Sequence, residues 1–234
     1  MKSFDYGIDA PNVLRNLAFS GFLCLVFASL FPVVRWLYSP AISLLATAGL
    51  WLYGSKIGKL HLREKLMKLV QWKGDELVLD EGCGSGLLLN AAAKRITVGR
   101  AYGVDIWRQE DLAGNDVQNT LNNAHLEGVA DRVEVKDGDV RSLPFEAESM
   151  DVAISLNVVH NISERQERDK AINEILRVLK PGGQFIICDF RNVGEYVTSF
   201  RGAGAGHVEK RFIGFVGFFP MFAAVGRKLS QKKD

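Results

Sequence analysis

The sequence has little of several features that would point to particular classes of protein. Its three cysteines lie far apart, Cys24 in a hydrophobic run, Cys83 in a glycine-rich turn and Cys188 in an apolar strand. They form neither the regular set of a disulfide framework nor the paired spacing of a zinc site, so we expect no metal centre and a reducing compartment. The net charge is only +2, and this balance gives no reason to expect a nucleic acid as partner.

Charge is almost missing from one long stretch near the amino terminus. Between Leu17 and Tyr53 the single charged side chain is Arg35. One membrane-spanning helix needs about 20 residues, so the stretch is too long for one span and close to the length of two. We expect helices over residues 17–34 and 41–53, with a turn at RWLYSP between them, and the second helix is short unless residues 36–38 join it. Aromatic residues stand where they would anchor at the membrane interfaces, namely Trp36, Tyr38, Trp51 and Tyr53.

Three other interpretations of this stretch compete with a membrane hairpin. A cleaved signal peptide is disfavoured because Asp5 and Asp9 precede the apolar run, which is also about twice too long. A buried hairpin in a soluble protein normally keeps a polar face, and an interfacial helix needs a charged one. The sequence offers neither face. It therefore favours a membrane anchor, with the lipid bilayer as a partner.

The next unusual stretch, LVLDEGCGSGLLLNAAAK, covers residues 77–94. A short buried strand meets Asp80 and Glu81, and a helix is expected from residue 87. Between them glycine stands at every second position, as Gly82, Gly84 and Gly86. Glycine permits positive φ and lets another molecule approach the main chain, and the unpaired N–H groups at the start of a helix suit an anionic group. The stretch therefore predicts a ligand held against the backbone.

The spacing of these glycines disfavours a nicotinamide or flavin cofactor. The dinucleotide fingerprint is G-x-G-x-x-G, and its last glycine would fall on Leu87 or Leu89. VLDEGCGSG instead resembles the first motif of class I S-adenosylmethionine-dependent methyltransferases, usually written V-L-D-hydrophobic-G-C-G-T-G. Glu81 stands where that family has an apolar residue, a departure that need not change the backbone geometry.

Further segments resemble the remaining parts of that family's domain, in order, over residues 74–229. AYGVDI ends a second strand at Asp105, about 20 residues past the loop, where a carboxylate can accept both ribose hydroxyls. RVEVKDGDV places Asp139 and Val140 after a third strand, which resembles the adenine-binding segment. MDVAISLNVVHNI ends a fourth strand near Asn157, and ILRVLKPGGQFIICDF resembles the family's helix, Pro-Gly-Gly turn and fifth strand.

The resemblance implies an α/β fold with a Rossmann-like seven-stranded sheet, helices on both faces, and S-adenosyl-L-methionine as cofactor. The chain would then consist of an N-terminal segment (1–16), a hydrophobic helical hairpin (17–54), a basic linker helix (55–73) and a methyltransferase domain (74–234). The residues implied to hold the cofactor are Asp80, Gly82, Cys83, Gly84, Gly86, Asp105, Ile106, Asp139, Val140 and Asn157.

The last two strands of the family form an antiparallel pair, expected here near residues 208–214 and 221–228. Three phenylalanines lie between or beside them, Phe215, Phe218 and Phe219. They belong either to buried strands or to a loop that meets the membrane or an apolar substrate. The sequence leaves both interpretations open.

Methyl transfer demands little of side chains, because alignment of the methyl group with its nucleophile supplies much of the acceleration. An oxygen or nitrogen acceptor can need a base to take its proton, and His160, just past the fourth strand, is the best placed candidate. A capping or packing role for His160 is an equally good interpretation. Asp189 and Arg191, beyond the fifth strand, either shape the acceptor pocket or belong to a loop. No catalytic residue is assigned from the sequence.

Five basic residues follow the apolar stretch directly, and only one acid, Glu64, lies among them. The basic residues are Lys56, Lys59, Arg63, Lys65 and Lys68. Such a flank favours the cytoplasmic side, although the same residues fit the solvated face of a helix over residues 56–71. We expect an integral membrane protein with its catalytic domain on the cytoplasmic side and an apolar or lipid-like methyl acceptor. A small soluble acceptor and a non-catalytic cofactor-binding scaffold are the alternatives, and the oligomeric state stays open.

Overall fold

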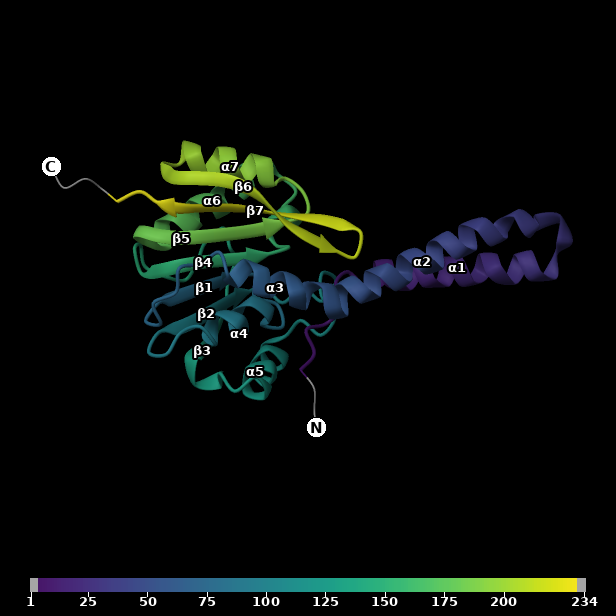
Figure 1. Ribbon diagram of the computed structural model, residues 1–234, viewed down its shortest axis with the longest axis horizontal. Helices are drawn as coiled ribbons and strands as arrows, with labels where there is room; N and C mark the ends of the chain where they lie inside the picture. The colour runs from purple at the N-terminus through teal and green to yellow at the C-terminus, as the bar shows by residue number, and fades with distance from the viewer. Residues whose placement is uncertain (1–3, 231–234) are drawn as a thin grey trace.

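The computed structural model describes residues 4–230, in which a seven-stranded sheet carries helices on both faces and a helical hairpin projects from one side (Figure 1). The strands follow the order β3-β2-β1-β4-β5-β7-β6. Strands β1 to β5 pair in parallel, whereas β7 is antiparallel to both β5 and β6. Their bounds are β1 Leu77–Glu81, β2 Arg100–Asp105, β3 Val133–Asp137, β4 Met150–Leu156, β5 Leu179–Asp189, β6 Ala205–Val216 and β7 Phe219–Lys228. The predicted seven-stranded Rossmann-like sheet is confirmed, and the last two strands are longer than expected.

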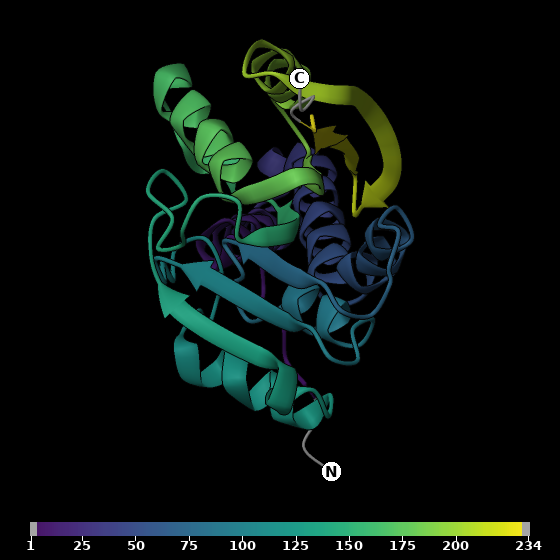
Figure 2. The ribbon, with the colours of Figure 1, turned by 90° about the vertical axis from the view of Figure 1, so that its left-hand side faces the viewer.

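Helices cover the two faces of the sheet separately (Figure 2). One face packs against α3 (Lys59–Met67), α4 (Leu87–Ala93) and α5 (Val117–Leu126), and the other against α6 (Arg165–Val178) and α7 (Val193–Gly202). Side chains alternate along a strand, so Val78 faces the first cluster and its neighbour Leu79 faces the second. The same alternation sends the two acids that follow, Asp80 and Glu81, to opposite faces.

The hairpin consists of α1 (Pro11–Leu30), a short 3₁₀ helix η1 (Pro32–Leu37) and α2 (Tyr38–Tyr53). The predicted bounds of the first helix were wrong, because α1 begins six residues before Leu17 and ends at Leu30. The second helix begins at Tyr38, within the extension that the sequence left open, and the turn η1 ends at Leu37, before RWLYSP ends. Pro40 does not break the chain, since it lies in the first turn of α2, where a missing N–H costs no helical hydrogen bond. A π-helical turn η2 (Gly54–Gly58) then carries α2 directly into α3.

Small residues bring the two hairpin helices together. Gly21 and Ala28 of α1 and Ala41 and Ala48 of α2 are buried, and a Cβ on Gly21 would lie 2.9 Å from Leu45. Large apolar side chains point outward instead, with Phe22 61 %, Val33 86 % and Ile42 66 % exposed. Two helices, Pro11–Leu30 and Pro32–Met67, are long and apolar enough to cross a membrane by length and composition. In the most apolar 18 residues of each helix, 11 % are buried.

The expected linker helix over residues 56–71 is a continuation of α2 that ends at Met67. One side of this helix packs on the sheet through Leu62, Leu66 and Met67. Its basic residues are not all on a solvated face, because Lys59 is buried and Arg63 pairs with Glu127 at 3.0 Å. Some of the basic residues after the hairpin therefore form contacts within the protein and do not face solvent.

Candidate active site

Three glycines form the turn between β1 and α4, each with positive φ: +67° at Gly82, +52° at Gly84 and +86° at Gly86. A Cβ on Gly82 would lie 2.3 Å from Val158, which follows β4. The turn therefore runs between the carboxyl ends of β1 and β4, where the strand order reverses and open α/β sheets bind their ligands. Only glycine combines this backbone with this close approach.

Asp80 and Cys83 lie behind the glycine turn. The backbone amide of Leu89 donates to Asp80, whereas Oδ2 of Asp80 has no partner within residues 4–230. Burial, assisted by the charge of Asp105, raises the pKa of Asp80 to about 8. Burial likewise raises the pKa of the Cys83 thiol, so Cys83 is a packed, protonated side chain. The unpaired oxygen of Asp80 is suited to a cationic group above it.

Asp105 ends β2 beside the glycine turn. Its Oδ2 accepts from the amide of Gly84 at 2.8 Å, and its Oδ1 accepts from the amide of Trp107 at 2.7 Å and from Asn115 at 3.2 Å. These bonds fix the carboxylate between the glycine turn and the loop after β2. Ile106, the next predicted residue, is half-exposed.

The other predicted cofactor residues lie across the same opening. Asp139 pairs with Arg141, and the hydrogen bond from this guanidinium holds the pKa of Asp139 below its usual range. Asn157 follows β4 with φ +59°, a conformation uncommon outside glycine, and its Oδ1 has no partner among the described residues. Asparagine tolerates this conformation better than most side chains, and the buried Oδ1 is a hydrogen-bond acceptor at the edge of the cavity.

These groups surround one cavity of about 540 Å³. Seven of the ten predicted cofactor residues line it, and Asp80, Cys83 and Gly86 lie behind its glycine wall; the lining predicted residues are Gly82, Gly84, Asp105, Ile106, Asp139, Val140 and Asn157. The cavity also reaches residues that sequence reasoning did not assign to a site, among them Trp51 and Gly54 at the base of the hairpin. A single space therefore joins the glycine turn to the hairpin.

Aromatic side chains line the hairpin end of this cavity. Trp51 meets Phe219 edge-on, with ring centroids 5.4 Å apart, and Phe218 at 6.0 Å. Phe219 contacts Phe190 at 5.0 Å, and Phe190 contacts His160 at 4.6 Å. The sequence had placed Trp51 at a membrane interface and left the phenylalanines undecided. The number of aromatic residues in these segments was visible in the sequence. Only the fold shows that their side chains form one row.

The hairpin base fits closely against the β6–β7 turn. A Cβ on Gly54 would lie 2.8 Å from the amide nitrogen of Gly217, and one on Gly217 would lie 2.9 Å from the carbonyl oxygen of Leu50. These two glycines let the backbones of α2 and the turn touch. The contact fixes Trp51 and Phe218 relative to each other.

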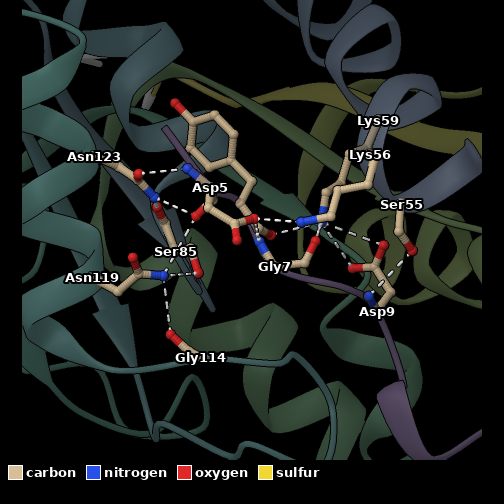
Figure 3. A network of polar contacts seen from close by, with 11 residues as sticks. Asp5, Gly7, Asp9, Ser55, Lys56, Lys59, Ser85, Gly114, Asn119 and Asn123 are labelled. Atoms are coloured by element: carbon tan, nitrogen blue, oxygen red, sulfur yellow. Dashed lines mark hydrogen bonds and ion pairs between the residues drawn. The ribbon is translucent and has the colours of Figure 1, made fainter. Parts of the chain in front are cut away.

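An N-terminal strap, residues 4–10, ties the hairpin to the glycine turn (Figure 3). The backbone of Asp5 exchanges hydrogen bonds with Asn123 of α5, which also donates to the carbonyl of Ser85 in the glycine turn at 2.9 Å. From the other side Lys59 donates to the carbonyls of Tyr6 at 2.7 Å and Gly7 at 3.1 Å. Burial lowers the pKa of Lys59. The sequence had placed this lysine in a basic flank and did not predict its internal contacts with the strap.

His160 lies in the short helix after β4 and lines the cavity. Its Nδ1 is 2.5 Å from Oδ1 of Asp189, at the end of the neighbouring strand β5. Asp189 is fully buried, and its Oδ2 accepts from the hydroxyl of Tyr196 at 3.0 Å. Arg191 donates to the carbonyl of His160 at 3.1 Å. The structure thus brings together the three residues that the sequence left without a role.

A sheet with five parallel strands in this order and a glycine turn at its switch point is typical of domains that bind a nucleotide-type cofactor. Residues 79–187 match the family model of a methyltransferase domain. The fold resembles the crystal structure of an S-adenosylmethionine-dependent methyltransferase from Aquifex aeolicus, with a TM-score of 0.60 and 22 % identity over 74 % of this chain and 94 % of the other. Residues 79–187 thus match a methyltransferase domain, the fold is that of S-adenosylmethionine-dependent methyltransferases, and S-adenosylmethionine is the cofactor that this match and this fold indicate.

Two curated relatives cover the same region. A probable tRNA methyltransferase 9B of Homo sapiens is 34 % identical over 51 % of this chain and 22 % of its own length. A sterol 4-C-methyltransferase of Caenorhabditis elegans is 32 % identical over 58 % of this chain and 36 % of its own length. The alignments span between about a fifth and a third of these relatives, so their names do not decide the acceptor.

The residues present fit S-adenosylmethionine, which supplies an electrophilic methyl group on a sulfonium centre. A Cβ on Gly82 would lie 2.3 Å from Val158, so there is no room for a side chain at this position. The main chain of the turn therefore stays bare and can contact the cofactor. Asp80 lies behind the glycine wall, where its carboxyl can attract the ammonium group or the sulfonium of the cofactor, and Asp105, Asp139 and Val140 can hold the ribose and adenine, as the resemblance implies. Asn157 brings an unpaired oxygen to the same space.

Proposed function

We propose that the protein is a membrane-anchored methyltransferase that transfers a methyl group from S-adenosylmethionine to an apolar or lipid-like acceptor at the cytoplasmic leaflet. The observation that carries this proposal is the shared cavity, which the glycine turn lines at one end and Trp51 and Gly54 of the hairpin base at the other. An acceptor that lies in the bilayer beside the hairpin base can therefore approach the cofactor without crossing water.

The outward side chains of the hairpin support a membrane anchor. Core helices of soluble proteins can be as long and apolar, but Phe22, Val33 and Ile42 are more than half exposed, and so large an apolar surface is unusual on a soluble monomer. Signal sequences also pass a test of length and hydropathy. Here the strap before the hairpin is packed on the domain through Asp5, and cleavage would remove that contact.

The placement of both hairpin ends supports a single side for the strap and the domain. The strap contacts α5, and α2 runs without a break into α3, so the chain leaves and re-enters at the same face of the domain (Figure 1). Lys56 remains exposed beside this face, where it pairs with Asp5 at 2.7 Å. Basic residues next to a span favour the cytoplasmic side, where anionic lipids also attract them.

The aromatic lining supports an apolar acceptor. Trp51, Phe190 and Phe219 form a continuous wall, and such a wall desolvates a polar molecule without offering it hydrogen bonds. The nematode relative is named as a sterol methyltransferase, which is compatible with an apolar acceptor. A small soluble acceptor and a non-catalytic scaffold are the competing functions. The first predicts label in water-soluble products, and the second predicts cofactor binding without transfer.

The experiment uses full-length protein, because removal of the hairpin would also remove the strap and Trp51 from the domain. Membranes that contain the protein are incubated with methyl-labelled S-adenosylmethionine and then extracted with organic solvent. We expect label in the lipid extract, and we expect the protein to resist an alkaline carbonate wash. Label in water-soluble products alone would refute the lipid-like acceptor.

A matched pair of variants tests the anchor. Phe22→Lys together with Ile42→Lys places two charges on the outward face of the hairpin, at about 2.5 to 3.5 kcal/mol each near a bilayer centre, so we expect release by the carbonate wash. Val98→Lys, on an 82 % exposed position of the domain, is the control and is expected to stay in the membrane fraction. Release of the unaltered protein would refute the spanning hairpin.

A further inference from the structure

We propose that His160 is the general base of the methyl transfer, positioned by Asp189, and that the accepting atom is the oxygen of a hydroxyl group on the apolar acceptor. The inference rests on the proposed function for the apolar nature of the acceptor. It goes beyond that function because it assigns a catalytic residue and the chemical group that is methylated.

The contacts of Asp189 determine how the imidazole ring is protonated. The carboxylate accepts from the hydroxyl of Tyr196 at 3.0 Å and from the backbone amide of His160 at 3.2 Å, both at Oδ2. Oδ1 lies 2.5 Å from Nδ1 of His160, and because a carboxylate only accepts, Nδ1 carries the proton. Burial and the charge of Asp189 raise the pKa of Tyr196, which keeps its hydroxyl a donor. Nε2 is left with a lone pair.

The ring is placed where a base is needed. His160 lines the cavity that the glycine turn also lines, and within residues 4–230 its Nε2 makes no hydrogen bond. The side chain is 10 % exposed, so it is shielded from bulk water but open to the cavity. Phe190 contacts the ring at 4.6 Å and limits the directions in which it can turn.

A packing role does not explain the carboxylate behind the ring. Burying an ionised carboxylate is costly, and here three donors on two elements are arranged to hold it. A histidine that only filled space would need no such partner. The pattern of a ring nitrogen bonded to a buried carboxylate, with the other nitrogen free towards a reactive space, is the arrangement by which a histidine base is oriented.

In the proposed step the methyl group moves from sulfur to the acceptor oxygen. The acceptor oxygen forms the new O–C bond with one of its lone pairs, and the S–C bond breaks with its electron pair left on sulfur. The proton of the hydroxyl goes to Nε2 of His160, and the resulting imidazolium is stabilised by Asp189. The proton leaves later to water at the mouth of the cavity. Base assistance of this kind typically contributes between about 10²- and 10⁴-fold to a rate.

An oriented base favours a hydroxyl over an amine as the accepting group. Carboxylates also line the cavity, among them Glu164, close to His160 in the sequence, so its charge does not select between the two. An amine attacks through its own lone pair and can lose its proton to water after the transfer, whereas a neutral hydroxyl is a weak nucleophile that gains from a base in the transition state. A neutral hydroxyl needs only the acceptor nitrogen that Nε2 offers.

The first measurement determines to which kind of atom the transferred methyl group is bonded. Full-length protein in detergent is incubated with methyl-labelled S-adenosylmethionine and the total lipid extract of its own membranes, and the product is treated with hydroiodic acid, which cleaves methyl ethers. We expect the label to leave as volatile methyl iodide after mild alkali has released none. Label that resists the acid is bonded to carbon or nitrogen and would overturn the inference while the proposed function stands. Label found only in water would overturn the lipid-like acceptor, and the same acid test on that product would still decide the inference.

The second measurement tests whether the side chain of His160 acts as a base. His160→Ala should slow single-turnover transfer by about 10²-fold or more with the cofactor dissociation constant unchanged. Added imidazoles should restore the rate, and more basic imidazoles should restore more, as a base requires and a space-filling role does not. Rescue independent of basicity, or a loss below about threefold, would overturn the inference.

Asp189→Asn provides a second variant that keeps the shape of the site. Its amide can donate to Nδ1 and so place the imidazole proton on Nε2, the wrong nitrogen for a base. We expect the rate of transfer to fall by at least tenfold, the acceptor KM to stay within about twofold, and imidazole to give no rescue because the native ring still fills the site. An unchanged rate in this variant would show that Asp189 does not position the base.

Discussion

Asp80 offers the sharpest test of the cofactor site, because its protonation should change when S-adenosylmethionine binds. Its side chain is buried on the α4 side of β1 with Oδ2 unpaired, and burial raises its pKa to about 8. At pH 7 a carboxyl with that pKa is about 0.9 protonated, and at pH 9 about 0.1. A cationic cofactor favours the ionised form, so binding should release up to about 0.9 proton at pH 7 and about 0.1 at pH 9.

The same shift fixes the direction of two pH dependences. The apparent affinity for the cofactor should rise about tenfold between pH 7 and pH 9, because the ionised fraction of Asp80 rises by that factor. The stability of the cofactor-free protein should change in the opposite sense. A carboxyl whose pKa is raised on folding stabilises the native state below its ordinary pKa, and this contribution is lost as the pH rises through about 8.

Calorimetry in two buffers of different ionisation enthalpy measures the proton release directly. Asp80→Asn keeps the shape of the side chain and should abolish that part of the release, so the difference between the two proteins excludes protons exchanged by the cofactor itself. Glu81→Gln is the matched control, since Glu81 is equally buried but faces the other side of β1, where Glu174 lies. Equal proton release in the wild type and in Asp80→Asn would refute the role of Asp80.

Three further predictions address the turn, the hairpin base and the strand. Gly82→Ala adds a Cβ 2.3 Å from its neighbour at φ +67°, with strain of ~1–2 kcal/mol, and should weaken cofactor binding in a titration at least about tenfold; Gly194→Ala, with open space around it, should not. Gly54→Val should raise the acceptor KM and leave the cofactor dissociation constant unchanged, because it separates α2 from the β6–β7 turn, whereas Gly49→Val meets no atom within 4 Å and should change neither. Glu81→Leu should raise the melting temperature, since it removes two unpaired buried oxygens that cost about 1–3 kcal/mol each, and a lower melting temperature would contradict this account.

The positions of the parallel strands along the chain and the glycine turn were readable from the sequence, because both depend on local patterns. Short apolar runs that end in Asp105, Asp137 and Leu156 mark parallel strands, and alternate glycines mark a backbone with positive φ. Asp105 was placed correctly at a strand end, yet its hydrogen bond to Gly84 depends on the lateral order of β1 and β2. No spacing along one strand carries that information.

The contacts between distant segments were not predictable in the same way. Lys59 looked like one member of a basic run, and its burial against Tyr6 and Gly7 depends on a strap more than 50 residues earlier. The pairing of His160 with Asp189 follows from β4 lying beside β5, with Leu156 opposite Cys188. With the strand order known, both residues fall at the same edge of the sheet. The sequence alone offered a histidine and an acid 29 residues apart.

The position of the hairpin base has a consequence for how an anchor can act on catalysis. Trp51 donates to the carbonyl of Asp9 at 2.8 Å, and Gly54 touches Gly217, so the base of α2 is held by the strap on one side and by the β6–β7 turn on the other. The strap in turn reaches the glycine turn through Asn123. A tilt of the hairpin in a bilayer must therefore displace the aromatic wall, the strap or both. Where the bilayer holds the hairpin at a set tilt, it also sets the shape of the acceptor end of the cavity, so activity should respond to bilayer thickness as well as to the supply of acceptor.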